Sequence, residues 1–292
     1  MRALVFGETG QVGRELGRAA AVRGIAARTL GRAGADLTDP AACARAILDC
    51  DADVVVNAAG YTAVDAAEDD LATAQVVNGD TPGAMAAAAA AKGVPILHVS
   101  TDYVFDGSNP GRPWRENDPT GPLSAYGASK LAGERAVAAA ARDHVILRTS
   151  WVFSAHGKNF VRTMLERGRN RSELRVVADQ RGGPTAARDV ADALWTVAEA
   201  WAAGRRRPGL YHFAGAPDTI WAEFAEAILA RTGWPERPRV VPIASADWPT
   251  RAARPAYSVL DCSAIAAAYG IGQPDWRPAL DAVVGELREV SA

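Results

Sequence analysis

A tyrosine and a lysine lie four residues apart in the segment GPLSAYGASKLAGE at 121–134, where a helix is expected to begin. Residues at this spacing share one helical face, so the phenol of Tyr126 and the ammonium group of Lys130 would lie one above the other. A nearby cation eases the ionisation of a phenol, and such a phenol can pass a proton to or from a substrate oxygen. A surface tyrosine packed on a lysine stem fits the same spacing, so the rest of the chain has to decide.

Three glycines follow the first predicted strand in the segment FGETGQVG at 6–13. A turn of this kind lets a diphosphate approach the backbone and the N-terminus of the next helix. The spacing G-x-x-G-x-x-G differs from the common G-x-G-x-x-G, and a plain strand–helix turn is the alternative. Its place directly after an apolar strand favours a dinucleotide site, made by Gly7, Gly10, Gln11, Val12 and Gly13.

Two further predicted strand ends fit the same nucleotide. Asp36 and Leu37 lie in the loop after the second strand, where a carboxylate would accept a hydrogen bond from an adenine amino group. Asp36 would equally serve as a helix cap before the proline that follows. The third strand ends with the small residues Ala58, Ala59 and Gly60, over which a cofactor could lie flat. Ligands of parallel sheets bind at these carboxyl ends, so we expect all five residues to contact a cofactor.

Short apolar runs alternate with alanine-rich helical segments through the first two-thirds of the chain. The runs are nearly continuously apolar, as strands buried on both faces should be. The alternation predicts an α/β fold with a doubly wound, Rossmann-like parallel sheet. The predicted strands are 3–7, 25–30, 53–60, 94–100 and 144–150, with 174–179 and 209–215 extending the sheet, and the predicted helices are 11–23, 40–49, 65–91 with a break at Pro82, 125–142 and 187–203.

The composition of the chain changes after residue 215, where prolines become frequent and the predicted helices become shorter. We therefore expect a dinucleotide-binding domain at 1–150, to which the segment at 187–215 returns. Residues 151–186 and 216–292 would form a smaller, mixed substrate-binding lobe.

Composition excludes several classes of partner. A formal net charge of −2 over 292 residues leaves no broad basic face, so nucleic acid is not expected as a partner. The chain opens without a leader peptide and has no apolar run of about 18 residues, so we expect no membrane association. Three cysteines and four scattered histidines lack the spacing of metal ligands, which predicts no metal and suits the reducing cytoplasm.

Several motifs, taken in order along the chain, resemble the extended short-chain dehydrogenase/reductase superfamily. Within it, the chain is similar to the dTDP-4-dehydrorhamnose reductase family. The similarity runs from residue 1 to RPAYSVLD at 254–261. The motifs that carry it are the glycine turn, VVNAAGYTAVDAAE, HVSTDYVFDG, PTGPLSAYGASKLAGE, LRTSWVFS and DQRGGPT.

The resemblance implies a catalytic role for three residues: Tyr126 as proton donor, Lys130 as its partner and Thr101 as a second hydroxyl. Lys130 would bind the nicotinamide ribose and, with the charge of the oxidised ring, lower the pKa of the phenol toward neutrality. Hydride from the nicotinamide and a proton from Tyr126 would then reduce a ketone to an alcohol. The resemblance also implies that the sugar is bordered by Thr62, Val64, Asp102, Tyr103 and Trp151.

The resemblance places the dTDP part of the substrate in the C-terminal lobe. Arg254 is then the candidate ligand of the diphosphate, and Arg251 is an alternative if the segment TRAAR is more than a solvated loop. Trp151 would offer a flat apolar face to a deoxysugar, although a buried core indole fits this position equally well.

The end of the second predicted strand bears on the choice of nicotinamide. Some members of the family hold the ribose hydroxyls there with a carboxylate, whereas this chain reads RTLGRAG. Arg32 follows a glycine in the loop and could make a two-pronged contact with a 2′-phosphate, whereas Arg28 could still lie within the strand. The cofactor is therefore NADPH or NADH, and we expect NADPH to be used at least as well.

The function implied is the reduction of the 4-keto group of dTDP-4-dehydro-L-rhamnose to give dTDP-L-rhamnose. The same chemistry on another dTDP-4-keto-6-deoxyhexose, as in a dihydrostreptose-type synthase, is the nearest alternative. A non-catalytic, nucleotide-binding regulatory subunit is a third, although it would have no need to keep Thr101, Tyr126 and Lys130. A homodimer is possible.

Overall fold

Continuous apolar runs build the centre of the molecule. In the computed structural model, which describes residues 1–108 and 111–289, six parallel strands form one sheet in the order β10-β5-β4-β3-β1-β2. The doubly wound parallel fold is therefore confirmed. The strands are β1 (Arg2–Phe6), β2 (Ala26–Leu30), β3 (Val54–Asn57), β4 (Ile96–Thr101), β5 (His144–Thr149) and β10 (Gly209–His212).

The strand order reverses at β1. The chain runs from β1 to β2 on one side and then returns to place β3 on the other side of β1. Helices that leave the two sides diverge at such a point, which opens a crevice above the carboxyl ends of the strands. β2 lies at the edge of the sheet, and its residues alternate between exposed and half-buried until Leu30. The expectation that every strand is buried on both faces is therefore wrong for β2.

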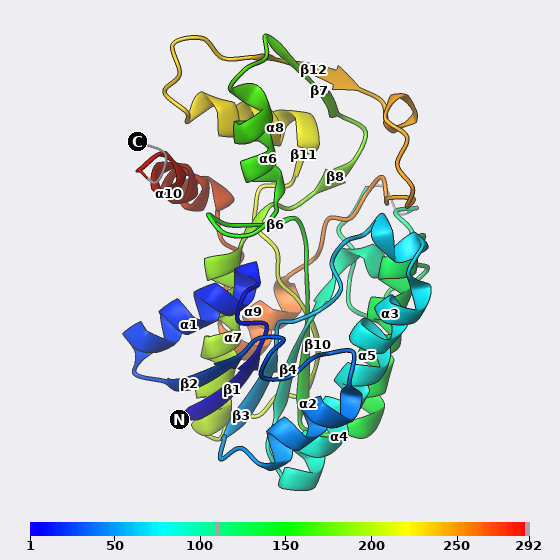
Figure 1. The fold of residues 1–292 in the computed structure, drawn as a ribbon, viewed down its shortest axis with the longest axis vertical. Coiled ribbons are helices and arrows are strands. Elements are labelled where there is room, and N and C mark those ends of the chain that lie inside the picture. The colour runs from blue at the N-terminus through cyan, green and yellow to red at the C-terminus, as the bar shows by residue number, and fades with distance from the viewer. Residues whose placement is uncertain (109–110, 290–292) are drawn as a thin grey trace.

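Helices cover both faces of the sheet (Figure 1). On one face, α1 packs against α7. Helix α9 lies beside this pair and contacts both α7 and β10. On the other face α4 packs between α2 and α5. These helices are α1 (Gln11–Arg23), α2 (Pro40–Leu48), α4 (Thr81–Lys92), α5 (Ala125–Ala140), α7 (Ala187–Ala202) and α9 (Ser263–Tyr269).

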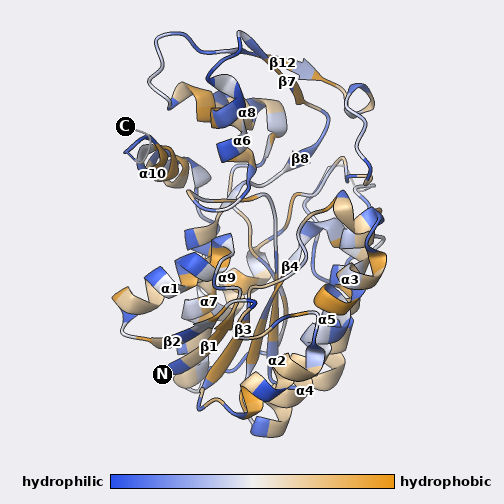
Figure 2. Ribbon diagram, in the orientation of Figure 1, coloured by the Kyte–Doolittle hydropathy of each residue, from blue (hydrophilic) through white to orange (hydrophobic). Residues whose placement is uncertain are grey.

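A second lobe stands above the sheet in Figure 1 and has an apolar cluster of its own. Figure 2 shows that α8 and α10 of this lobe carry both hydrophobic and hydrophilic residues. Two of its short strands run parallel to one another, and α8 packs against both. The elements of this lobe are α6 (Phe160–Gly168), β7 (Glu173–Val177), α8 (Trp221–Ala230), β12 (Arg239–Ile243) and α10 (Trp276–Glu289).

Short strands and turns join the lobes. The strand pairs are β6 (Val152–Phe153) with β9 (Thr185–Ala186), and β8 (Arg181–Gly182) with β11 (Thr219–Ile220). The remaining short helices are η1 (Ala66–Glu68), α3 (Leu71–Gln75), η2 (Val76–Asp80), η3 (Asp102–Val104) and η4 (Ser245–Asp247).

The expected strand at 174–179 does form, but it does not extend the main sheet. It is β7, which pairs with β12 in the second lobe. Its burial alternates along the strand, as expected when only one face of a strand is covered. The strand at 209–215, in contrast, joins the main sheet as β10, so that part of the prediction is confirmed.

The expected break of the helix at Pro82 lies earlier than predicted. Pro82 lies near the start of α4, directly after η2, and cannot donate to a carbonyl of that preceding turn. The change of geometry occurs in η2, a π-helical turn over Val76–Asp80. This turn directs the buried amide of Asn78 to the backbone of Tyr61 and to the hydroxyl of Ser129. The irregular turn thus anchors the loop that follows β3.

A buried ion pair joins α5 to the sheet. The side chains of Arg148 and Glu134 are 3% and 5% exposed and meet through two hydrogen bonds of 2.9 and 2.7 Å. The hydroxyl of Ser100 also donates to this carboxylate at 2.5 Å. Removal of one member of such a pair leaves an uncompensated charge in the interior.

We expect Glu134→Ala to lower the free energy of unfolding by about 3–5 kcal/mol, because it leaves Arg148 buried without its counter-charge. Glu173→Ala is the matched control. It removes the exposed contact with Arg239 and should cost at most about 1 kcal/mol. Denaturant unfolding of both variants checks this, and similar losses for the two would show that burial adds nothing to the pair.

Candidate active site

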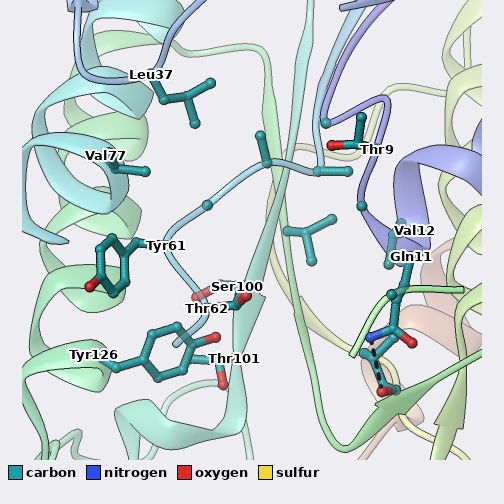
Figure 3. A pocket seen from close by; sticks show the side chains of 18 of the residues that line it. Thr9, Gln11, Val12, Leu37, Tyr61, Thr62, Val77, Ser100, Thr101 and Tyr126 are labelled. Carbon is teal, nitrogen blue, oxygen red and sulfur yellow. Dashed lines mark hydrogen bonds between the residues drawn. The ribbon is translucent and has the colours of Figure 1, made fainter. Parts of the chain in front are cut away.

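A cavity of about 970 Å³ lies above the carboxyl ends of β1, β3 and β4 and reaches into the second lobe. Its size exceeds that of most small-ligand sites and fits two ligands placed end to end. Figure 3 shows the glycine turn with Thr9, Gln11 and Val12 on one side and Tyr61 and Tyr126 on the other. The crevice predicted from the strand order is therefore present.

The glycine turn fits an approaching diphosphate. A Cβ on Gly13 would lie 1.9 Å from the carbonyl oxygen of Gly7, and a Cβ on Gly7 would lie 2.9 Å from the backbone of Ala58. Gly7 also has a φ of 112°, which favours glycine. No side chain caps α1, so the first amides of this helix face the cavity with their dipole and backbone donors available to an anion.

Gln11 and Val12 line the cavity as predicted, but Gln11 is held by the second lobe. Its amide oxygen accepts hydrogen bonds from Ser154 and Asn159, both at 2.9 Å. The start of α1 is thereby tied to the segment that enters the second lobe.

Tyr126 and Thr101 come together from different elements. Ser124 caps α5 by accepting from the amide of Gly127 at 3.1 Å, which places Tyr126 in the first turn of the helix. Thr101 is the last residue of β4, and Figure 3 shows its side chain beside the phenol. The ring of Tyr103 meets that of Tyr126 edge to face, with 5.8 Å between centroids.

The phenol is hard to ionise in the chain by itself. Burial raises the pKa of Tyr126 to about 12, against the lowering effect of a hydrogen bond with Thr101. The lowering of this pKa toward neutrality was expected from Lys130 together with the charge of a bound, oxidised nicotinamide, and it stays a prediction. A buried phenol with a high pKa stays protonated at neutral pH and is fit to donate a proton.

Lys130 lies one turn along α5 from Tyr126 and behind the cavity wall. Its Nζ donates to the carbonyl oxygen of Val99 at 2.7 Å. Burial lowers the pKa of Lys130 to about 8, although the carboxylate of Glu134 acts to raise it. The ammonium group therefore has donors to spare for a ligand at the edge of Gly60, where a Cβ would lie 3.9 Å from Nζ.

The residues expected around the sugar are brought together. Thr62, Val64, Asp102, Tyr103 and Trp151 all line the cavity. The sequence reasoning missed further lining residues because their positions are fixed only by packing, and these include Tyr61, Val77, Lys158 and Trp221.

Trp151 forms a wall between the lobes. Its indole stacks on that of Trp221 with 3.5 Å between centroids and 7° between planes. Its backbone has a φ of 46°, which is unusual for a bulky residue and marks strain of the kind found at functional sites. A Cβ on Gly182 would lie 2.6 Å from the indole, so this glycine makes room for it. Trp151 therefore lines the cavity and is not the core indole considered as the alternative.

Arg254 lies next to the cavity but is not part of its lining. Its guanidinium binds both oxygens of Asp65, at 3.1 and 2.7 Å, and touches the hydroxyl of Tyr103. Arg251 pairs with Asp69 on the surface nearby. A diphosphate at this site would have to share Arg254 with Asp65.

At the other end of the cavity, Arg32 is 86% exposed and its Nε lies 3.9 Å from a carboxylate oxygen of Asp36. Asp36 accepts from the amide of Thr38 at 2.9 Å and does not cap α2. The cap is Asp39, which accepts from Ala42 at 2.9 Å. The second oxygen of Asp36 faces Arg32, and both side chains line the cavity. Leu37, Ala58, Ala59 and Gly60 also line this part of the cavity.

An acid does reach the end of β2, contrary to the reading of the sequence. It is Glu8, the second residue of the glycine turn. One oxygen of Glu8 lies 2.8 Å from where a Cβ on Gly31 would be, and the other lies 3.5 Å from the hydroxyl of Thr29. This carboxylate lies in the turn after β1, so the residues of the second strand do not reveal it.

Within residues 1–108 and 111–289, no group of three His, Cys, Asp or Glu side chains is placed to hold a metal ion. The helices of the same part of the chain are too short or too polar to cross a membrane.

Comparison with known proteins gives one consistent result. Residues 1–289 match the model of the RmlD substrate binding domain. The chain is 49% identical to the dTDP-4-dehydrorhamnose reductase of Burkholderia thailandensis, over 98% of this chain and 99% of the relative. It is 43% identical to that of Sinorhizobium fredii, over 98% of each.

Solved structures agree. A dTDP-4-dehydrorhamnose reductase from Clostridium acetobutylicum superposes with a TM-score of 0.92 at 33% identity, covering 99% of this chain and all of that one. The enzyme of that name from Bacillus anthracis, in complex with NADP, gives a TM-score of 0.90 at 30% identity, covering 98% of this chain and 99% of that one.

We expect Arg32→Ala to weaken NADP⁺ binding by about 1.5–3 kcal/mol and to leave NAD⁺ binding unchanged, because only the 2′-phosphate offers the guanidinium a charged partner. Titration calorimetry with both cofactors checks this. Arg28→Ala is the control, since Arg28 lies within β2. Parent protein that binds NAD⁺ far more tightly than NADP⁺ would show that Glu8, and not Arg32, governs the choice.

Proposed function

The chain belongs to the family of the RmlD substrate binding domain, and on this basis we propose that it is an NAD(P)H-dependent dTDP-4-dehydrorhamnose reductase. It reduces the 4-keto group of dTDP-4-dehydro-L-rhamnose and forms dTDP-L-rhamnose. One observation carries the proposal beyond family membership. The cavity that begins at an uncapped helix N-terminus ends at the paired hydroxyls of Thr101 and Tyr126.

The residues divide the cavity between two ligands. The glycine turn would hold the diphosphate of the cofactor, and Arg32, Asp36 and Leu37 would face its adenosine. The ammonium group of Lys130, anchored by the carbonyl of Val99, would bind the nicotinamide ribose. When bound, the reduced nicotinamide supplies the hydride.

The chain supplies the proton and the shape of the sugar site. Tyr126 and Thr101 bind the keto oxygen from one side, and Tyr126 donates its proton as negative charge develops there. The indole of Trp151 covers the apolar face of the deoxysugar. Arg254 binds the diphosphate of the substrate by sharing its guanidinium with Asp65.

We also propose that 1–150 and 187–215 bind the cofactor and that 151–186 and 216–292 bind the substrate. The second apolar cluster supports this division. Within 216–292, however, α9 packs against β10 and α7 and lies with the sheet. A homodimer and a cytoplasmic location remain predictions from the sequence.

The direct test incubates the protein with dTDP-4-dehydro-L-rhamnose and NADPH and follows both NADPH absorbance and the sugar product. Formation of dTDP-L-rhamnose with matching loss of NADPH supports the proposal. A much higher kcat/KM for another dTDP-4-keto-6-deoxyhexose would replace the substrate, and no oxidation of NADPH with any of them would remove the activity.

Tyr126→Phe should lower kcat by about 10²–10⁴-fold, because the ring still packs but the proton is lost. Cofactor affinity, measured by calorimetry, should stay near that of the parent. Tyr61→Phe is the control, since this second phenol also lines the cavity but lies beside Asp70. A Tyr126→Phe variant with normal turnover would rule out Tyr126 as the donor.

Arg254→Ala should raise the KM for the dTDP-sugar and leave that for NADPH unchanged. Loss of a charge-assisted contact of this kind costs about 1.5–3 kcal/mol. Arg251→Ala is the comparison, because its pair with Asp69 is exposed and should matter little. If Arg254→Ala binds dTDP as well as the parent does, another residue holds the diphosphate.

A further inference from the structure

Asp102 is a buried carboxyl group that forms no ion pair with any residue that the structure describes. It follows Thr101 directly, lines the cavity and is 2% exposed. Its Oδ1 accepts from the hydroxyl of Thr101 at 3.1 Å. Its Oδ2 is shielded from solvent, and among residues 1–108 and 111–289 no donor meets it in hydrogen-bond geometry. The hydroxyl of Ser258 lies close enough to lower the pKa of the carboxyl without making such a bond. Its expected place at the border of the sugar site does not by itself require that the buried group be an acid.

A carboxylate in this position would be unstable. Burial without a paired charge disfavours the ionised form, and an oxygen with no donor gains from carrying a proton itself. Accordingly, burial raises the pKa of Asp102 to about 7, against lowering contributions from Ser258 and Thr101. The carboxyl therefore holds a proton in the neutral range, unlike an exposed aspartate.

Asp102 and Tyr126 are joined through one hydroxyl group. The hydroxyl of Thr101 bonds to the carboxyl on one side, and on the other side it lies beside the phenol, whose pKa it lowers (Figure 3). A threonine hydroxyl donates one hydrogen bond and accepts others, so it can pass a proton along the line. The amide of Tyr103 donates to the same oxygen at 3.2 Å and fixes its position.

The proposed reduction leaves a deprotonated phenol in a buried site. Tyr126 holds its proton strongly, since its pKa is about 12, so its phenolate must be reprotonated before the next turnover. From this geometry we propose that Asp102 is the relay residue that returns a proton to Tyr126 through the hydroxyl of Thr101. The inference rests on the proposed function and adds a source for the proton.

The proton balance of the step is simple. The Tyr126 O–H bond breaks as its proton moves to the oxygen of the substrate, whose carbon accepts the hydride. The hydroxyl of Thr101 turns from Asp102 to the phenolate and gives up its proton there. The carboxyl proton of Asp102, carried for this step on Oδ1, then moves to the oxygen of Thr101. Asp102 is left as a carboxylate and takes one proton from solvent through the cavity. Each turnover thus consumes one hydride and one solvent proton.

The relay predicts a pH dependence. Asp102 must start protonated, so kcat should fall about tenfold per pH unit above pH 7. The titratable groups that face it are the phenols of Tyr103 and Tyr126, and burial raises the pKa of both above that of free tyrosine. Arg254, which contacts Tyr103, stays charged throughout. Lys130, with a pKa of about 8, would add a separate limb at higher pH.

Asp102→Asn keeps the shape of the side chain and removes its proton. We expect a lower kcat and no fall of kcat near pH 7. The fall of kcat at higher pH that Lys130 causes should be retained. The proton inventory in mixtures of H₂O and D₂O should change from curved to linear, since fewer protons move together. Asp106→Asn, a change of the same kind in an exposed turn, should leave the profile unaltered. An Asp102→Asn variant with the rate and pH profile of the parent overturns the relay.

Ser258→Ala supplies a second test that does not remove the acid. Because Ser258 lowers the pKa of Asp102, its loss should move the kcat limb to higher pH. A limb that stays in place assigns it to another group and counts against the proposal.

A third measurement needs no turnover. The pKa of Asp102 is raised on folding, so its contribution to stability is full below the unfolded pKa of 3.8 and is lost as pH rises through about 7. Thermal unfolding should therefore show that Asp102→Asn gains stability relative to the parent as the pH rises from about 4 to about 7, with no further relative change above that. No relative gain shows that the carboxyl is not buried in its neutral form. If the parent protein were inactive on every dTDP-4-keto sugar, the proposed function would be wrong. The pH dependence of stability measured for Asp102→Asn would still hold.

Discussion

A Cβ on Gly13 would lie 1.9 Å from the carbonyl oxygen of Gly7, so the two backbones touch where β1 turns into α1. No other side chain fits either position without moving the helix. The contact sets the direction of α1, whose uncapped N-terminus then points across the ends of the strands. It also lets the loop after β3 pass within contact distance at Ala58. The cavity, the packing of α1 on α7 and the tie between Gln11 and the second lobe all follow from this approach.

On the other side of the cavity, α5 sets three polar groups at intervals of four residues. The phenol of Tyr126 reaches the cavity, the ammonium group of Lys130 lies beneath it, and the carboxylate of Glu134 is paired with Arg148 in the interior. Polarity buried in this way is tolerated because each group has a partner at hydrogen-bond distance. A rigid helix with its deepest member fixed to β5 keeps the upper two in place, as precise positioning of a reacting group requires.

Local patterns were enough to predict most of the sheet and the pair on α5. Apolar runs such as Val54–Asn57 report burial directly, and spacing along one helix fixes which side chains share a face. Features that depend on contacts between distant segments were not predictable. The sequence shows that β7 is a strand but not that β12 is its partner. Glu8 reaches the end of β2 from another strand, and Trp221 meets Trp151 only because the second lobe folds back.

The left-handed backbone of Trp151 affects both the stability of the fold and the shape of the cavity. A non-glycine residue in this region costs of the order of 1–3 kcal/mol, which a glycine would recover. That glycine would take away the indole that stacks on Trp221 and forms a wall of the cavity. Loss of the stacked indole costs about as much stability as the relief of strain recovers, or more. Selection for heat tolerance and selection for turnover therefore both favour the indole, and the strained backbone persists because the side chain that it carries is needed twice.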